Sequence, residues 1–293
     1  MPLSHRIQRL DRMQFCENVA SAGAAERPVI ASVKMNLLDF LARWPMGRMS
    51  SPNDKANNGS DTHAGPGASS AALESARSDM VERQLRRRDI RSPRVLEAMG
   101  SVPRHLFISP EHIGEAYADS PLPIGAGQTI SQPYMVAAMA DALVLEGPEK
   151  VLEIGAGSGY QAAVLSLVAR EVIAIESQAA LAEEARARLA RLGYNNVRVE
   201  IGDGSQGWPA DAPYDAILVT AGAPYVPPPL LEQLSEGGRL VIPVGPANQQ
   251  ELLRIVKREG RTARESLFAC RFVPLLGRYG WPAPSSGQEP SHG

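Results

Sequence analysis

A glycine-rich turn between two apolar runs is the part of the chain whose residues could do chemistry. Residues 150–176 read KVLEIGAGSGYQAAVLSLVAREVIAIE; the first apolar run is cut by Gly155, Gly157 and Gly159, and the second ends on Glu176. Glycines let a backbone approach a ligand closely, and a carboxylate about twenty residues further on can accept hydrogen bonds from a ribose diol. The pattern therefore predicts a strand, turn, helix and strand that bind an adenosine-containing cofactor.

The acidic residue Glu153 indicates which cofactor is bound. A dinucleotide fingerprint, G-x-G-x-x-G, would place its third glycine at Tyr160, whereas the spacing here is G-x-G-x-G. A carboxylate at Glu153 would repel a pyrophosphate but attract the amino group and sulfonium of S-adenosylmethionine. The other interpretation of Glu153 is a solvated residue at a strand end. The combined pattern favours S-adenosylmethionine, with a nicotinamide cofactor as the alternative.

A second acidic position, Asp203, lies between two glycines after a third expected strand. Its carboxylate could accept a hydrogen bond from an adenine amino group, while Gly204 would keep the wall of the pocket thin. An aspartate in an ordinary turn is the competing interpretation, because Asp-Gly is a common turn pair. Beside the first motif, we interpret Asp203 and Gly204 as cofactor-binding residues.

The elements that must position these residues alternate between strands and helices. This alternation predicts an α/β fold with a doubly wound, mostly parallel sheet, whose ligand sites lie at the carboxyl ends of the strands. Two N-terminal helices are expected over 79–89 and 92–99, the second capped by Ser92. A C-terminal antiparallel hairpin is expected around Glu259-Gly260, from strands near 252–257 and 267–273. The other expected strands are 151–154, 172–175, 197–201, 216–219 and 239–244, and the other helices 135–143, 179–192 and 229–234.

Composition divides the chain into three parts. Residues 50–75 are rich in Ser, Asn, Gly, Ala and Pro, with almost no large apolar side chain that could offset the entropy of ordering. We therefore expect a disordered N-terminal extension over 1–75, a folded domain over 76–281 and a frayed tail over 282–293.

Charge and cysteine usage restrict the classes of partner. The net charge of −2 provides no general attraction to nucleic acid, and no apolar stretch approaches the roughly 20 residues of a membrane span. The two cysteines, Cys16 and Cys270, lie far apart, which suits a reducing compartment and a cytoplasmic protein. The five histidines show no ligand spacing, so we expect no metal site. We expect a monomer.

Residues 121–134, PLPIGAGQTISQPY, have turn residues and no helical or strand period. A loop of this kind, before a helix, is expected to cover the cofactor through Gln128, Thr129 and Ile130. The neighbouring Ser131 is not marked as a nucleophile by its surroundings, because no histidine follows nearby and no G-x-S-x-G motif encloses it.

The chain resembles the protein-L-isoaspartate O-methyltransferase family. The resemblance extends over roughly residues 79–277, and its most specific element is the TISQP stretch. It is carried, in order, by MVERQLRRRDI, RVLEAMGSVPRHLF, AYADSPLPIG, GQTISQPYMVAAM, VLEIGAGSGYQAAVL, IGDGSQGWP, YDAILVTAGAP and GGRLVIPVG.

This resemblance implies a Rossmann-like methyltransferase domain that transfers a methyl group from S-adenosylmethionine to the α-carboxylate of isoaspartyl residues in damaged proteins. It implies Ser131 as the active-site serine, and Glu176, Asp203 and Gly204 as cofactor contacts. Ser205 departs from the family, whose bacterial members often have Trp at this position. This departure is expected to loosen the adenine side of the pocket.

Three other functions share the cofactor half of the pattern. A nucleic-acid methyltransferase is disfavoured because the turn after the fourth strand, TAGAPY, lacks the N/D-P-P-Y/F pattern that holds a base. A sensor that only binds the cofactor would have no need of the TISQP loop. A small-molecule carboxyl methyltransferase is the main alternative enzyme.

Overall fold

A seven-stranded sheet forms the centre of the protein. The computed structural model describes residues 69–282. Within them the strands follow the order β5-β4-β3-β6-β7-β8-β9, and all neighbours from β5 to β7 are parallel while β7-β8 and β8-β9 are antiparallel. The predicted α/β fold with a C-terminal hairpin is confirmed. The strands are β3 (Lys150–Ile154), β4 (Glu171–Glu176), β5 (Val197–Ile201), β6 (Tyr214–Val219), β7 (Leu234–Val244), β8 (Gln250–Arg258) and β9 (Arg261–Cys270).

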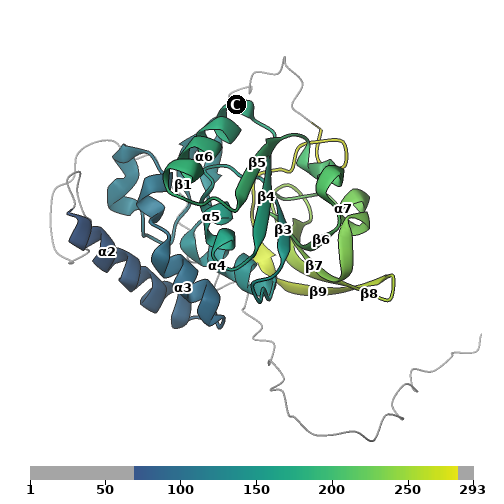
Figure 1. Cartoon of the computed structure of the whole chain (residues 1–293), viewed down its shortest axis with the longest axis horizontal. Coiled ribbons are helices and arrows are strands. Elements are labelled where there is room, and N and C mark those ends of the chain that lie inside the picture. The colour runs from purple at the N-terminus through teal and green to yellow at the C-terminus, as the bar shows by residue number, and fades with distance from the viewer. Residues whose placement is uncertain (1–68, 283–293) are drawn as a thin grey trace, which may run out of the picture.

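Helices cover both faces of this sheet, as a doubly wound topology requires (Figure 1). The buried residues fall into two clusters, one on each face, because side chains alternate along every strand. One face carries α3 (Pro93–Ser101), α4 (Pro133–Ala142), α5 (Tyr160–Ser166) and α6 (Ala179–Arg191). The other face carries α7 (Pro228–Glu232) and the chain that follows β9.

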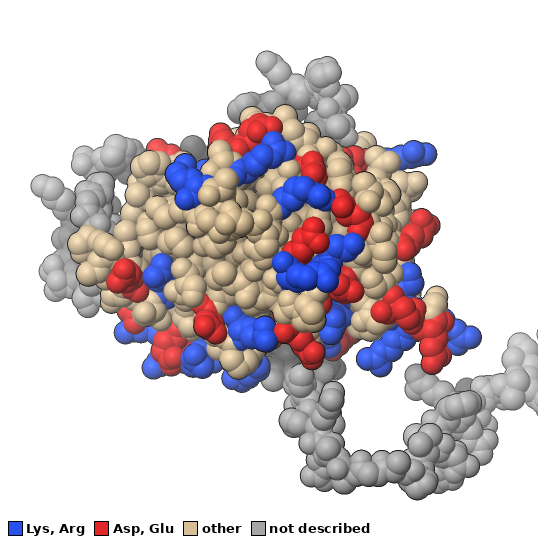
Figure 2. Space-filling view, in the orientation of Figure 1, with Lys and Arg blue, Asp and Glu red and all other residues tan. Residues whose placement is uncertain are grey.

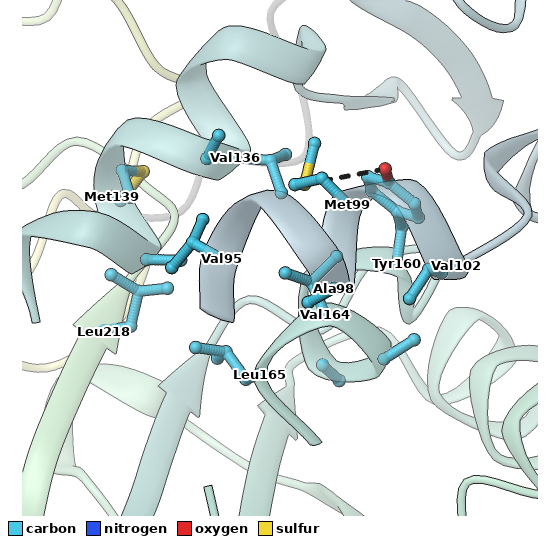
Figure 3. Close-up of a cluster of buried hydrophobic side chains, with 14 of the residues drawn as sticks. Val95, Ala98, Met99, Val102, Val136, Met139, Tyr160, Val164, Leu165 and Leu218 are labelled. Atoms are coloured by element: carbon cyan, nitrogen blue, oxygen red, sulfur yellow. Dashed lines mark hydrogen bonds between the residues drawn. The ribbon is translucent and has the colours of Figure 1, made fainter. Parts of the chain in front are cut away.

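The larger cluster fixes the glycine turn against the N-terminal helices (Figure 3). The Tyr160 hydroxyl, at the start of α5, donates to the Met99 sulfur of α3 over 3.8 Å. Each fully buried aliphatic side chain contributes about 1.5–3 kcal/mol to folding, so the contacts between α3, α4 and α5 hold this face firmly. The residues labelled in the cluster are Val95, Ala98, Met99, Val102, Val136, Met139, Tyr160, Val164, Leu165 and Leu218.

The N-terminal helices differ partly from the prediction. Ser92 caps α3 as expected, since its hydroxyl accepts a hydrogen bond from the Val95 amide over 3.3 Å. The helix expected over 79–89 begins earlier: α2 spans Ser70–Asp79 and runs directly into a π-helical segment, η1 (Met80–Arg86). Met80 and Leu85 are both buried, and their five-residue spacing suits the i→i+5 repeat of a π-helix. The 3.6-residue spacing of an α-helix, on which the prediction was based, therefore does not apply to this segment.

The start of α2 also lies inside the range assigned to the N-terminal extension. Ser69 caps the helix by accepting a hydrogen bond from the Ala72 amide over 3.3 Å, so residues 70–75 are helical. Composition missed them because α2 buries no residue fully. The rest of the predicted extension, residues 1–68, and the tail from 283 lie outside the described residues.

Residues 121–134, expected to be an irregular loop, contain a small antiparallel hairpin. Its strands are β1 (Leu122–Gly125) and β2 (Gln128–Ile130). The turn between them has positive φ at Gly125, Ala126 and Gly127, with values of 95°, 49° and 70°. Strands of only four and three residues are too short to show an alternating pattern, which explains why the sequence did not reveal them.

The C-terminal hairpin forms around Glu259-Gly260, as predicted. Both turn residues have positive φ, 52° and 70°, the requirement of a type I′ turn. The second strand, however, begins at Arg261 and ends at Cys270, earlier than the predicted 267–273. Its first six residues, RTARES, are exposed and include no large apolar side chain, so no apolar signal marked them.

Candidate active site

A cavity of about 220 Å³ opens at the carboxyl ends of β3, β4 and β6. The predicted glycine turn, the carboxylate at the end of β4 and the β2 segment all meet there. The lining therefore brings together most of the residues that the sequence indicated. These residues are 128–131, 154–158, 175–178, 273–276, Val136, Tyr160, Gln161, Gly204, Thr220 and Ala221.

The glycine turn is held in place by Thr220, which follows β6. The Thr220 hydroxyl donates to the carbonyl oxygens of Ile154 at 2.9 Å and Gly155 at 2.8 Å. Gly155 has φ +97°, and a Cβ at this position would lie 2.4 Å from the Thr220 hydroxyl oxygen. The turn therefore requires glycine here for both conformation and space.

Glu176 has its orientation fixed by backbone amides. Its Oε2 accepts from the Gly157 amide at 2.9 Å, and its Oε1 accepts from the Gln178 amide at 3.0 Å. The Ser177 hydroxyl makes a longer contact to Oε1, at 3.4 Å. A carboxylate offers about four lone-pair positions, so Glu176 keeps capacity to accept from a ligand in the cavity that it lines. This arrangement fits the diol of an adenosyl ribose.

Glu153 does not line the cavity, although the sequence assigned it to the cofactor. It is 0% exposed, and neither of its carboxylate oxygens has a hydrogen-bond partner among the described residues. Its neighbours on β4 and β6 are Ala174 and Leu218, both members of the apolar cluster. Burial, and secondarily the charge of Glu176, raise the pKa of Glu153 well above its usual range. The alternative of a solvated strand-end residue is also wrong.

Two other predicted residues, Gly159 and Asp203, are not among the residues that line the cavity. Gly159 packs against α6, where an added Cβ would lie 3.2 Å from Leu189. The Asp203 carboxylate accepts from the Ser205 amide at 2.9 Å, the Ser205 hydroxyl at 2.6 Å and the Arg278 amide at 2.9 Å. Ser205 is fully buried and is not among the residues that line the cavity.

A second cavity, of about 410 Å³, adjoins the first. Ser131, on the loop that leads into α4, is half-buried at the boundary and lines both spaces. Arg271 is the one charged residue among those that line the second cavity. The shared lining residues are Thr129, Ser131, Thr220, Val273 and Pro274, and the others are Pro121, Gln132, Met135, Ala247, Arg271 and Phe272.

Several site residues were missed by the sequence interpretation. Thr220 was noted as a strand end but not assigned to the site, and its position at the end of β6 was the available signal. Residues 273–276 and Arg271 follow β9, and only the tertiary structure brings them to the cavities. Within residues 69–282, no cluster of three or more metal-binding side chains is present.

The two adjoining spaces can serve a transfer reaction. The first offers a glycine turn and an oriented carboxylate to a nucleoside, and the second can receive an acceptor group. Three hydroxyl-bearing and two apolar residues line both spaces, so an acceptor would meet the donor there without an ionisable side chain in between.

Comparison with known proteins agrees with this geometry. Residues 75–280 match the family described as protein-L-isoaspartate(D-aspartate) O-methyltransferase. A protein-L-isoaspartate O-methyltransferase of Syntrophus aciditrophicus is 55% identical over 205 residues, which are 69% of this chain and 94% of the relative. One from Geobacter metallireducens is 56% identical over 207 residues, 70% of this chain and 96% of the relative.

Solved structures give the same result. A protein-L-isoaspartate O-methyltransferase is 31% identical with a TM-score of 0.65, and the match covers 70% of this chain and 67% of the other. A putative protein-L-isoaspartate O-methyltransferase from Plasmodium falciparum, in complex with S-adenosyl-L-homocysteine, is 27% identical with a TM-score of 0.61. That match covers 68% of this chain and 98% of the other. The chain therefore belongs to the protein-L-isoaspartate O-methyltransferase family, enzymes that use S-adenosylmethionine to methylate isoaspartyl residues of damaged proteins.

Proposed function

We propose that Ser131 holds the isoaspartyl α-carboxylate at the boundary between the two cavities. The observation that carries this proposal is that Ser131 lines both spaces. A neutral hydroxyl can donate to a carboxylate and keep one of its oxygens aimed into the first cavity. Thr129 and Thr220, which also line both spaces, place two further hydroxyls beside this position.

The chemistry requires orientation more than proton transfer. When bound, S-adenosylmethionine supplies a methyl group on a sulfonium, which is a good leaving group. An α-carboxylate has a pKa of roughly 3.5 and is already ionised at neutral pH, so no general base is needed. The chain contributes by aligning this carboxylate and by removing water from it, effects that are worth several kcal/mol.

In this proposal the cofactor occupies the smaller cavity. The backbone at Gly155, Gly157 and Gly204 borders it, Glu176 accepts from the ribose, and the β2 segment covers it through Gln128, Thr129 and Ile130, all of which line the space. Glu153, Gly159 and Asp203 act indirectly, because they support lining residues and do not line the cavity themselves.

Isoaspartyl-containing proteins and peptides are the proposed partners, and we propose a cytoplasmic monomer. Lys and Arg are interspersed with Asp and Glu on the face seen in Figure 2, which offers no large basic patch to a nucleic acid. Among the helices of residues 69–282, none has the length and apolarity to cross a membrane. Cys270 is a buried free thiol, which agrees with a reducing compartment.

A labelled-methyl assay tests this proposal. The protein is incubated with S-adenosylmethionine and one of three acceptors: an isoaspartyl peptide, its aspartyl twin, or small carboxylic acids. We expect label in the isoaspartyl peptide alone, as a base-labile methyl ester. Equal labelling of the aspartyl twin, or labelling of the small acids alone, would overturn the assignment of the second cavity to an isoaspartyl backbone.

A further inference from the structure

Asp119 joins the two ends of the segment that carries Ser131. Its Oδ1 accepts from the backbone amide of Tyr134 at 3.1 Å, and the two residues are 15 positions apart in the chain. The segment between them contains the β1–β2 hairpin and then Ser131. Residues 119–134 therefore form a closed loop whose ends are Asp119 and the start of α4.

The same contact caps α4 from outside the helix. Pro133 is the first residue of α4 and has no amide hydrogen, so Tyr134 offers the first backbone donor of the helix. The preceding residue, Gln132, makes no side-chain capping hydrogen bond. Asp119 therefore supplies the oxygen that an N-cap side chain would supply, and its charge interacts favourably with the helix dipole.

Arg88 and Asp89, which follow η1, hold this closure in place. The Nη1 of Arg88 donates to the Asp119 Oδ2 at 2.8 Å, and its guanidinium carbon lies 3.3 Å from the centroid of the Tyr134 ring. The Tyr134 hydroxyl donates to the Asp89 carboxylate at 2.9 Å. Tyr134 is only 2% exposed. The side chains of Arg88 and Asp119 are 34% and 27% exposed, so this ion pair is better shielded from water than an ordinary surface pair.

Ser131 lies between two anchored points. On one side, Ile130 pairs with Leu122 in the hairpin, and both side chains are buried. On the other side, Tyr134 is buried at the start of α4. Ser131 itself is half-buried in the short connection between these points. Its position therefore depends on where the first turn of α4 is held, and Asp119 holds that turn.

We propose that Asp119 is a positioning residue for Ser131: it caps α4, pairs with Arg88 and so keeps the Ser131 hydroxyl at the boundary between the two cavities. Asp119 is not among the residues that line either cavity, so it acts on an acceptor only through the segment that it closes. The inference rests on the role of Ser131 in the proposed function.

The test is a cycle of variants in the full chain: Asp119→Ala, Ser131→Ala and the two combined. Because a charged capping group is lost, we expect Asp119→Ala to lower kcat about tenfold and to speed hydrogen exchange of the Tyr134 amide about tenfold. In a chain that already carries Ser131→Ala, the same change should lower kcat by less than about twofold. Affinity for S-adenosylhomocysteine, measured by calorimetry, should stay within about twofold in every variant.

Asp119→Asn is the conservative variant, because its side-chain oxygen can still accept from the Tyr134 amide. Its kcat should stay within about threefold of the parent value. The matched controls are Asp79→Ala and Ser266→Ala, both at exposed positions. Asp79 pairs with Arg83 at 3.4 Å within the N-terminal helices, and Ser266 lies on β9, so neither closes the segment.

The outcomes separate this inference from the proposed function. Wild-type turnover in Asp119→Ala, or losses that multiply in the combined variant, would overturn the inference and leave the role of Ser131 intact. Wild-type turnover in Ser131→Ala would instead contradict the proposed function, and the inference with it.

If Asp119→Ala does not fold, Arg88→Gln takes its place in the cycle. This variant removes the ion pair and leaves the cap, so we expect kcat to fall about threefold in the parent and to stay unchanged beside Ser131→Ala. An equal fall in both backgrounds would overturn the inference.

Discussion

The guanidinium of Arg104 lies over the ring of Tyr160, with its central carbon 5.0 Å from the ring centroid. Arg104 is 0% exposed, and its Nε donates to the Ala116 carbonyl at 2.8 Å. Burial lowers the pKa of Arg104 to about 10, although nearby Tyr160 and Asp119 raise it. This buried cation joins the N-terminal layer to the first residue of α5, which lines the cofactor cavity.

Replacing Arg104 by lysine tests this relationship. An ammonium is hydrated more strongly than a guanidinium and is not planar, so we expect Arg104→Lys to lower the free energy of unfolding by about 3 kcal/mol at pH 7. Burial favours the neutral amine of the introduced lysine, so the unfolded chain binds more protons than the folded chain. The loss of stability relative to the parent chain therefore shrinks as pH rises towards 9.5. Denaturant melts of Arg104→Lys and the exposed Arg261→Lys across this range check the result.

The role of Ser131 predicts a loss in turnover. A hydrogen bond to a charged group is worth about 1.5–3 kcal/mol, so Ser131→Ala is expected to lower kcat roughly tenfold to hundredfold. Affinity for S-adenosylhomocysteine should change by no more than about twofold, since most of the cavity lining is unchanged. Steady-state kinetics and calorimetry on Ser131→Ala and Ser266→Ala measure both quantities. Wild-type turnover in Ser131→Ala would remove the proposed role.

Glu153 predicts a pH dependence of stability. Its raised pKa means that the folded chain holds a proton that the unfolded chain has lost, so this contribution to stability is complete below the ordinary carboxyl pKa and is lost as pH rises. The neutral side chain of Glu153→Gln does not titrate, so this variant loses no stability in this way as pH rises. The variant should gain up to about 1.4 kcal/mol of relative stability per pH unit above pH 5, until the buried carboxyl ionises.

Denaturant melts of the parent and of Glu153→Gln between pH 5 and 8.5 measure this gain. The matched control is Glu97→Gln, an exposed position on α3. Parallel pH curves for the parent and Glu153→Gln would show that the carboxyl is ionised in the fold.

The contact between Gly155 and Thr220 predicts a sensitive position. Gly155→Ala is expected to lose about 1–3 kcal/mol of stability from φ alone, and more from the clash with the Thr220 hydroxyl. Gly193→Ala isolates the conformational part, because its φ is +81° and nothing lies within 4 Å of the added Cβ. The melting temperature of Gly155→Ala should therefore be lower than that of Gly193→Ala. The reverse order would contradict the close approach of the two strand ends.

The boundary of the catalytic unit is tested by shortening the chain. A chain that begins at Ser69 retains the cap of α2 and every lining residue of both cavities. We expect it to methylate an isoaspartyl peptide at a rate within about twofold of the full chain, as judged by steady-state kinetics. A chain that begins at Ser75 removes the first turn of α2 and should melt at a lower temperature. A large loss of turnover in the chain that begins at Ser69 would show that residues 1–68 belong to the catalytic unit.

The sequence predicted well those features that local patterns determine. The strand at 197–201 matches β5, and Ser92 caps α3 as expected, because apolar runs and caps depend on nearby residues. The turn at 155–159 follows β3 and Glu176 ends β4, as the local pattern predicted. A match to known relatives confirmed the family that these motifs resembled.

Features that depend on tertiary contacts could not be predicted in this way. Asp203 seemed free to meet a ligand, but its partner Arg278 is 75 residues away in sequence. Whether Glu153 faces solvent, a ligand or the core depends on which helices cover that face of β3. The polar half of β9 forms a strand because β8 pairs with it, and its own residues give no such signal.

The wall common to both cavities constrains how this enzyme can diverge or be engineered. Thr129, Ser131 and Thr220 line both spaces, so a substitution there alters both cavities together. If the larger space receives the acceptor, as proposed above, selection for a new acceptor can act independently at the residues of 69–282 that border the larger space alone. Those available in this chain are Pro121, Gln132, Met135, Ala247, Arg271 and Phe272.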